Sequence, residues 1–183
     1  MAVENDEDAK SYRWYVVQTL KGRERSDAGH IQEDVISADE EAFVFENERE
    51  FRINKEWVKE LEPLFPGYIF VITRDIEDFA ARLRRSKHRL RILEVEGAAV
   101  PIREDEEAYL KRIGGEDHIA RYSEGIRIGD RIEIESGAFA GWSGEVRKLD
   151  RHNRWASIIL PLMGTDMEVK IGLGIVKNYP ARA

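Results

Sequence analysis

The sequence predicts an α+β protein of two modules, the first mixing strands with helices and the second made of short strands. Three observations predict this class. Aromatic and β-branched runs alternate with helical periodicity over residues 12–113. A polar, glycine-flanked segment at 114–124 has the composition of a linker. About five strand patterns then follow within roughly 50 residues, which is the spacing of a small β-barrel.

The first module begins with a strand and an amphipathic helix. Residues 14–18 are aromatic or β-branched, which favours a strand. After Gly22, apolar side chains recur at Ala28, Ile31 and Val35, and this spacing predicts one face of a helix. A short strand is expected at 42–45. The alternating pattern over 49–62 predicts a charged hairpin.

A nearly continuous apolar run over residues 64–72 predicts a central strand covered on both faces. Pro66 and Gly67 must lie at its entrance, because proline cannot donate within a ladder. Asp75 can cap the next helix, whose outer side is expected to carry basic residues. A strand at 92–95 and a helix at 104–113 with an acidic first turn complete the module. The side chains expected to face inward from the capped helix are Ile76, Phe79, Ala80, Leu83 and Leu90.

The second module contains the most informative stretch, residues 129–146. Ile132 and Ile134 lie on one face of an extended segment whose other face is charged, which is the pattern of a half-buried strand. Glycines at 137, 141 and 144 then mark a long turn. Strands are expected near 126–135, 144–150, 154–162, 166–171 and 174–177.

Composition excludes several classes of protein. The 183 residues include no cysteine, which excludes a disulfide scaffold and a thiolate zinc site. No apolar run has membrane-spanning length, and residues 1–11 read as a disordered acidic tail where a secretory signal would be basic and then apolar. We therefore expect a soluble, cytoplasmic protein with no membrane contact.

The net charge of −7 is unevenly distributed. Residues 1–124 carry 20 basic and 29 acidic side chains, whereas residues 125–178 carry 8 basic and 7 acidic ones. Residues 82–91 hold six basic side chains and no acidic one. Because a phosphate senses charges within a Debye length of roughly 8 Å, such a segment can attract a polyanion despite the acidic total.

The predicted RNA-binding side chains form two groups. Around a turn of the second module, arginines offer planar donors, Trp142 or Trp155 can stack a base, and Asn153 is expected at positive φ. The other group belongs to the basic segment at 82–91. The alternative is that both groups are solvated surfaces that pair with nearby acids. The residues are Arg147, Lys148, Arg151, His152, Asn153, Arg154 and Trp142, with Arg82, Arg85, Lys87 and Arg89 in the first module.

Enzymatic chemistry is not expected. The four histidines lie in separate segments without metal-ligand spacing, and there is no cysteine nucleophile. The glycines at 172 and 174 lead into a strand, so they cannot place a helix N-terminus against a phosphate. We expect no catalytic residue, no metal and no cofactor.

Two stretches in this order resemble the NusG family of transcription elongation factors. They are residues 14–18 followed by Phe65-Pro66-Gly67-Tyr68, and the segment 129–146, which is similar to a KOW motif. The resemblance covers residues 12–178. It implies an N-terminal NGN domain over 12–113, an α/β sandwich with an antiparallel sheet. It also implies a small SH3-like KOW β-barrel over 125–178, with 114–124 as the linker.

The resemblance further implies that the NGN domain binds the clamp helices of RNA polymerase through an apolar patch, while the KOW barrel recruits a second partner. We expect that partner to be RNA, as a structured leader element, and the protein to act as a monomer in which two tethered contacts reinforce each other. The alternative for the patch residues is that they are core. Carried over by position, they are Trp14, Tyr15, Phe65, Pro66, Tyr68 and Phe70.

The sequence differs from that of the general, housekeeping member of the family, and these differences favour a specialised paralogue. The loop at 161–165 lacks the phenylalanine through which the general factor contacts a ribosomal protein or Rho, and the arginine-rich segments make the chain most similar to the LoaP subgroup. This similarity predicts antitermination. Two alternatives remain: a housekeeping factor that couples polymerase to the ribosome or to Rho, and a KOW-type RNA-binding protein that acts without polymerase. Strand-favouring sequences at 155–160 and 166–171 argue against a helical form of the barrel.

Overall fold

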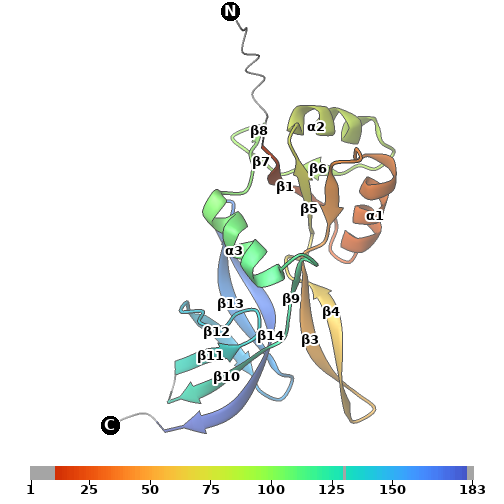
Figure 1. The fold of residues 1–183 in the computed structure, drawn as a ribbon. Coiled ribbons are helices and arrows are strands. Elements are labelled where there is room, and N and C mark those ends of the chain that lie inside the picture. The colour runs from red at the N-terminus through yellow and green to blue at the C-terminus, as the bar shows by residue number, and fades with distance from the viewer. Residues whose placement is uncertain (1–10, 130, 181–183) are drawn as a thin grey trace, which may run out of the picture.

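The structure is a computed structural model that describes residues 11–129 and 131–180, so most of the predicted acidic tail lies outside the described residues (Figure 1). An antiparallel sheet in the order β2-β5-β1-β6 forms the centre of the N-terminal part. In its register, Val16 lies opposite Phe70. The strands are β1 (Arg13–Gln18), β2 (Glu41–Phe43), β5 (Tyr68–Thr73) and β6 (Arg91–Ile92). The strand predicted from the apolar run at 64–72 therefore begins only at Tyr68.

Helices pack against the sheet and divide its apolar residues into two clusters. Val17, Ile69 and Val71 face α1 and α2, while Trp14, Val16 and Phe70 belong to the cluster that includes α3 residues. Asp75 caps α2 as predicted, because its carboxylate accepts the Asp78 N–H at 3.1 Å. The helices are α1 (Glu24–Asp34), α2 (Ile76–Arg85) and α3 (Glu104–Gly114). Because α2 ends at Arg85, Leu90 lies beyond it and not on its inward face.

Short strands and a long hairpin complete the N-terminal part. The predicted hairpin at 49–62 is longer than expected, and its turn residues Asn54 and Lys55 have φ values of 51° and 71°. The segment 114–124 carries a short strand that runs parallel to the hairpin's first strand. These elements are β3 (Glu46–Ile53), β4 (Glu56–Pro63), β7 (Glu94–Val95), β8 (Ala98–Ala99) and β9 (Ile119–Ala120).

The remaining strands form one five-stranded sheet in the order β11-β10-β14-β13-β12, which we call the β domain. Two expected boundaries are wrong. The run 126–135 is split by a turn at Gly129, whose φ is 60°, and the two expected last strands are continuous. The strands are β10 (Ser123–Ile128), β11 (Arg131–Ser136), β12 (Val146–Asp150), β13 (Trp155–Leu162) and β14 (Thr165–Tyr179). The chain therefore has the α+β class that its sequence predicts.

The β domain packs directly on the N-terminal part, with the β3–β4 hairpin projecting beside it (Figure 1). One cluster of buried side chains joins Phe45 and Leu110 to Phe139 and Leu160. At the contact, a Cβ atom on Gly172 would lie 2.3 Å from the Glu48 carbonyl oxygen, so only glycine fits there. No helix within the described ranges is long and apolar enough to cross a membrane.

Candidate protein and nucleic-acid interfaces

The turn at 65–68 joins the hairpin to β5, and glycine is needed at its centre. Gly67 has a φ of 91°. Its N–H donates to Glu24 Oε1 at 2.7 Å, and its carbonyl accepts the Thr19 N–H at 2.9 Å. The first bond fixes the turn to α1 and the second fixes it to the residue after β1, while Pro66 is exposed.

Aromatic rings from three strands gather on one face of the N-terminal sheet. Trp14 and Phe70 are 2% and 0% exposed, and their ring centroids lie 6.2 Å apart. Phe43 of β2 lies edge-on to Trp14 at 5.1 Å and stacks on Phe70 at 5.6 Å. We call these three rings the aromatic socket. Phe43 was not among the predicted patch residues, although its place in the expected strand at 42–45 was a signal for it.

Most of the predicted polymerase patch is therefore buried in this arrangement. Phe65 and Tyr15 are 1% and 9% exposed, like Trp14 and Phe70. Within the predicted set, Tyr68 is half-buried and Pro66 is exposed, so a partner can reach these two directly. The other four predicted side chains lie in the core, as the alternative interpretation expected. Their role in binding stays a prediction.

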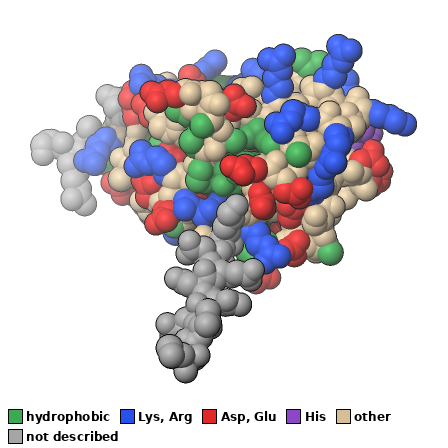
Figure 2. Space-filling model, turned by 90° about the horizontal axis from the view of Figure 1, so that it is seen from above, with side chains coloured by type: hydrophobic (Ala, Val, Ile, Leu, Met, Phe, Trp, Pro, Cys, Tyr) green, Lys and Arg blue, Asp and Glu red, His purple; other side chains and the backbone are tan. Residues whose placement is uncertain are grey.

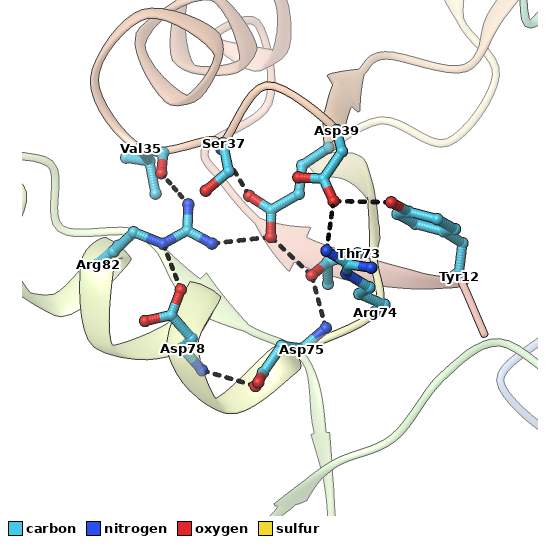
Figure 3. Close-up of polar contacts among 10 residues, drawn as sticks. Tyr12, Val35, Ser37, Asp39, Thr73, Arg74, Asp75, Asp78 and Arg82 are labelled. Atoms are coloured by element: carbon cyan, nitrogen blue, oxygen red, sulfur yellow. Dashed lines mark hydrogen bonds and ion pairs between the residues drawn. The ribbon is translucent and has the colours of Figure 1, made fainter. Parts of the chain in front are cut away.

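Arg82 differs from its expected position, because its side chain points back into the protein (Figure 3). Its guanidinium binds Glu40 Oε1 at 2.7 Å and Asp78 Oδ2 at 2.9 Å, and it also donates to the Val35 carbonyl. The side chain is only 19% exposed. The expectation that Arg82 lies on the outer side of α2 is wrong, because a carboxylate 42 residues away in sequence holds it.

The acceptor in this network, Glu40, is held in its charged form. Its carboxylate also accepts the Ser37 N–H at 2.8 Å and the Thr73 hydroxyl at 2.7 Å (Figure 3). Burial raises the pKa of Glu40, but the hydrogen bonds from Arg82, Ser37 and Thr73 outweigh it and hold this pKa below its ordinary value. The resulting stability is present above the unfolded glutamate pKa and is lost as the pH falls through the lower folded pKa.

Replacing Arg82 by alanine is expected to lower the free energy of unfolding by about 2 kcal/mol, because Glu40 loses a charged donor in a site with little water. Urea denaturation at neutral pH measures the change. Arg85→Ala is the matched control, since Arg85 is exposed on the same helix and its removal leaves no buried group unpaired. Equal stabilities of the two variants would contradict the structural role of Arg82.

Five other cations near the end of α2 form a surface that we call the basic ridge. Lys and Arg side chains gather on one side of the face seen in Figure 2. No ridge side chain has an ion pair with any residue that the structure describes. A groove of about 500 Å³ beside the ridge is lined by Arg23 and by three ridge residues. The ridge consists of Arg84, Arg85, Lys87, Arg89 and Arg91.

Two stacked histidines connect the ridge to α1. The rings of His30 and His88 lie 4.2 Å apart and nearly parallel, at 9°. His88 Nε2 is also 3.4 Å from Asp34 Oδ2. These contacts hold the segment that follows α2 against α1, so the ridge is fixed in position although its cations are exposed.

The predicted RNA-binding turn of the β domain lies between β12 and β13, and its members differ in availability. Arg151 and His152 are exposed, and Arg147 lies 3.4 Å from the exposed Glu145. Asn153 binds the Asp150 carboxylate through its backbone and side-chain N–H groups, at 3.0 and 2.8 Å. The expected positive φ belongs to the next residue, because Asn153 is held in a turn by these bonds.

Arg154, which has a φ of 50°, crosses to the N-terminal part. Its guanidinium lies 2.5 Å from Glu50 Oε2 and 4.0 Å from the centre of the Trp57 ring, both in the hairpin. The hydrogen bond to Glu50 raises the pKa of Arg154. Arg154 therefore already holds the two parts of the chain together, which the charge pattern of the turn did not indicate.

Trp142 is separated from that turn. It lines a groove of about 410 Å³ between α3 and the β domain, together with Tyr109 and Leu160. Of the two tryptophans considered for stacking, Trp155 is the one beside the cations, since Lys148 and Lys170 lie 5.3 and 4.8 Å from its ring centre. Sequence reasoning missed Lys170, which becomes a neighbour because β13 and β14 pair Ser157 with Lys170.

Glu106 of α3 is a second residue that sequence reasoning missed. Its buried carboxylate accepts the backbone N–H groups of Met163 and Gly164, at 2.9 and 3.1 Å, from the loop between β13 and β14. It also accepts the Arg103 N–H at 3.3 Å in a capping box. The acidic helix start was expected, but the loop that it binds is nearly 60 residues away.

Comparisons with known proteins agree with this fold. The family described as "Transcription termination factor nusG" matches residues 12–111. "Transcription termination/antitermination protein NusG" of Staphylococcus carnosus is 24% identical over 174 residues, covering 90% of this chain and 94% of the relative. The protein of the same description from Staphylococcus epidermidis has the same identity and coverage. A solved structure described as "Domain interaction in Thermotoga maritima NusG" aligns with a TM-score of 0.56 at 20% identity, covering 88% of this chain and 93% of that one.

Proposed function

Because the chain belongs to the NusG family of transcription termination and antitermination factors, which are not enzymes, we propose that it holds RNA polymerase and RNA together. In this proposal, residues 12–113 form the polymerase-binding domain, 114–124 the linker and 125–178 the RNA-binding domain. The polymerase contact uses the aromatic side of the N-terminal sheet. RNA contacts the turn of the β domain and the basic ridge.

The observation that carries the RNA part is the basic ridge. In a chain of net charge −7, five neighbouring cations have no ion pair among the described residues, while carboxylates are abundant elsewhere. Such a group repels itself unless an external anion neutralises it, and phosphates are the anions that a transcription factor meets. Arg147 and Arg151 add exposed cations on the β domain.

A specialised, LoaP-like role in antitermination is part of the proposal. It is supported by the loop at 161–165, which carries no phenylalanine and which binds Glu106 through two backbone N–H groups. A loop engaged in this way is a poor site for a ribosomal protein or Rho. The exposed arginines of the β domain favour a nucleic acid as the second partner.

Neutralising the ridge by Arg85→Gln, Lys87→Gln and Arg89→Gln is expected to weaken binding of a leader transcript about tenfold at physiological salt. Loss of three phosphate contacts should also flatten the salt dependence of log K by roughly 2 units for a single strand. Arg147→Gln with Arg151→Gln tests the β domain in the same way. Fluorescence anisotropy across a salt series measures both sets.

The matched control removes three cations elsewhere, by Arg52→Gln, Arg112→Gln and Lys177→Gln, and therefore changes the net charge equally. Its affinity and salt dependence should stay close to those of the wild type. If the control and the ridge variant weaken binding alike, the effect is one of total charge. If neither the ridge variant nor the Arg147→Gln, Arg151→Gln variant alters RNA binding, both proposed surfaces are ruled out.

A further inference from the structure

The aromatic socket is closed by a side chain of this same protein. His118, just before β9, stacks on Phe43 with ring centroids 3.5 Å apart at 14°. It lies edge-on to Trp14 at 5.4 Å, and its Nε2 is 3.1 Å from Glu41 Oε1. The side chain is buried, at 9% exposure. His118 covers one face of Phe43, and Lys111 also lies over the Trp14 ring, with its ammonium 5.6 Å from the ring centre.

Two features of His118, its backbone conformation and an unpaired ring nitrogen, are unusual for a buried side chain. Its φ of 57° lies in the left-handed region, which non-glycine residues adopt uncommonly, although histidine is found there more often than most. Its Nδ1 is buried without a hydrogen-bond partner among the described residues, and an unpaired buried polar atom is unfavourable. An apolar side chain in the same place would leave no polar atom unpaired.

The segment that carries His118 is also held by few bonds. Its strand β9 has only two residues, and the Glu46 N–H donates to the His118 carbonyl at 2.9 Å. The preceding Gly115 has a φ of 60°, so the chain turns sharply as it leaves α3. Opening the segment breaks few backbone hydrogen bonds, although it must also take the buried Ala120 out of the core cluster.

We propose that residues 115–120 are a removable plug and that the partner which replaces His118 presents an arginine to the socket. A guanidinium is planar, stacks on aromatic faces and pairs with a carboxylate through two N–H groups, so it fits Phe43 and Glu41 better than imidazole does. The nearby Lys111 does not oppose this, because its ammonium lies 2.6 Å from the Glu107 carboxylate. This inference rests on the proposed function, since RNA polymerase is the protein that supplies the arginine.

Three full-length variants test the plug by their affinity for core RNA polymerase. His118→Ala empties the socket and should bind about tenfold more tightly, because a competitor for the same surface is removed. His118→Arg places the better-fitting group in the chain itself and should bind about tenfold more weakly. Glu116→Ala changes an exposed residue of the same segment and should bind like the wild type.

Hydrogen exchange of residues 115–122 gives a second measurement, which does not need polymerase. Exchange should be faster in His118→Ala than in Glu116→Ala, and faster in the wild type when polymerase is bound. If no variant binds polymerase, the proposed function fails and the partner assigned here fails with it. If polymerase binds the wild type and His118→Ala equally while residues 115–120 stay protected, the plug alone is overturned.

Discussion

Replacing Phe70 by alanine should lower the free energy of unfolding by about 3–5 kcal/mol, which is the usual cost of removing a fully buried phenylalanine ring. Phe70 is 0% exposed, and its ring centre lies 5.6 Å from that of Phe65 and 5.9 Å from that of Phe45. Four neighbouring rings cannot all move to fill the space. Chemical denaturation followed by circular dichroism measures the loss.

Pro66→Ala is the control, because it changes an exposed residue of the same turn and should cost no more than about 1 kcal/mol. A loss below 1 kcal/mol for Phe70→Ala would mean that the ring is not packed as described. The expected result also bears on binding experiments. Weaker polymerase binding by a Phe70 variant would report a damaged core, so Tyr68 and Pro66 are the better positions for testing direct contact.

Glu106→Ala should release the β domain from α3. The substitution removes the charged acceptor of the Met163 and Gly164 N–H groups, and losing these two hydrogen bonds should cost about 2–3 kcal/mol, or roughly a hundredfold in the docking equilibrium. Small-angle X-ray scattering should therefore show a larger radius of gyration.

Glu104→Ala is the matched variant, since Glu104 lies in the same first turn but its side chain is 86% exposed. Some loss of helix stability is expected for Glu106→Ala alone, because its carboxylate also bonds the Arg103 N–H. Scattering that is the same for both variants would show that Glu106 does not control docking. A lower helix content without expansion would assign it a capping role only.

The sequence predicted those elements whose signals are local. The strand at Trp14 needed only its aromatic and β-branched residues, and the start of α2 needed only the capping carboxylate of Asp75. The turn at 65–68 followed from the fact that proline cannot donate within a ladder. These predictions depend on residues close together in the chain, where periodicity and side-chain chemistry act directly.

The candidate site was harder to predict because its contacts join distant residues. From the sequence, Arg82 is expected to point outward, because its partner Glu40 comes close only in the fold. In the same way, Arg154 is expected to be a free turn residue, because Glu50 and Trp57 come close to it only in the fold. Periodicity tells which face of an element is apolar, but not which element covers it. For that reason His118 gave no sequence signal, although its ring lies edge-on to Trp14, a residue predicted for the patch, and stacks on Phe43.

The two residues between β9 and β10 give the molecule a mechanical property. Because this connection is so short, the β domain cannot move far while β9 stays paired with the hairpin. If the β domain binds RNA as proposed, tension on that RNA strand would pass along the backbone to β9 and act first on its short parallel pairing. Force on the growing transcript would then help to open residues 115–120 and expose the aromatic socket.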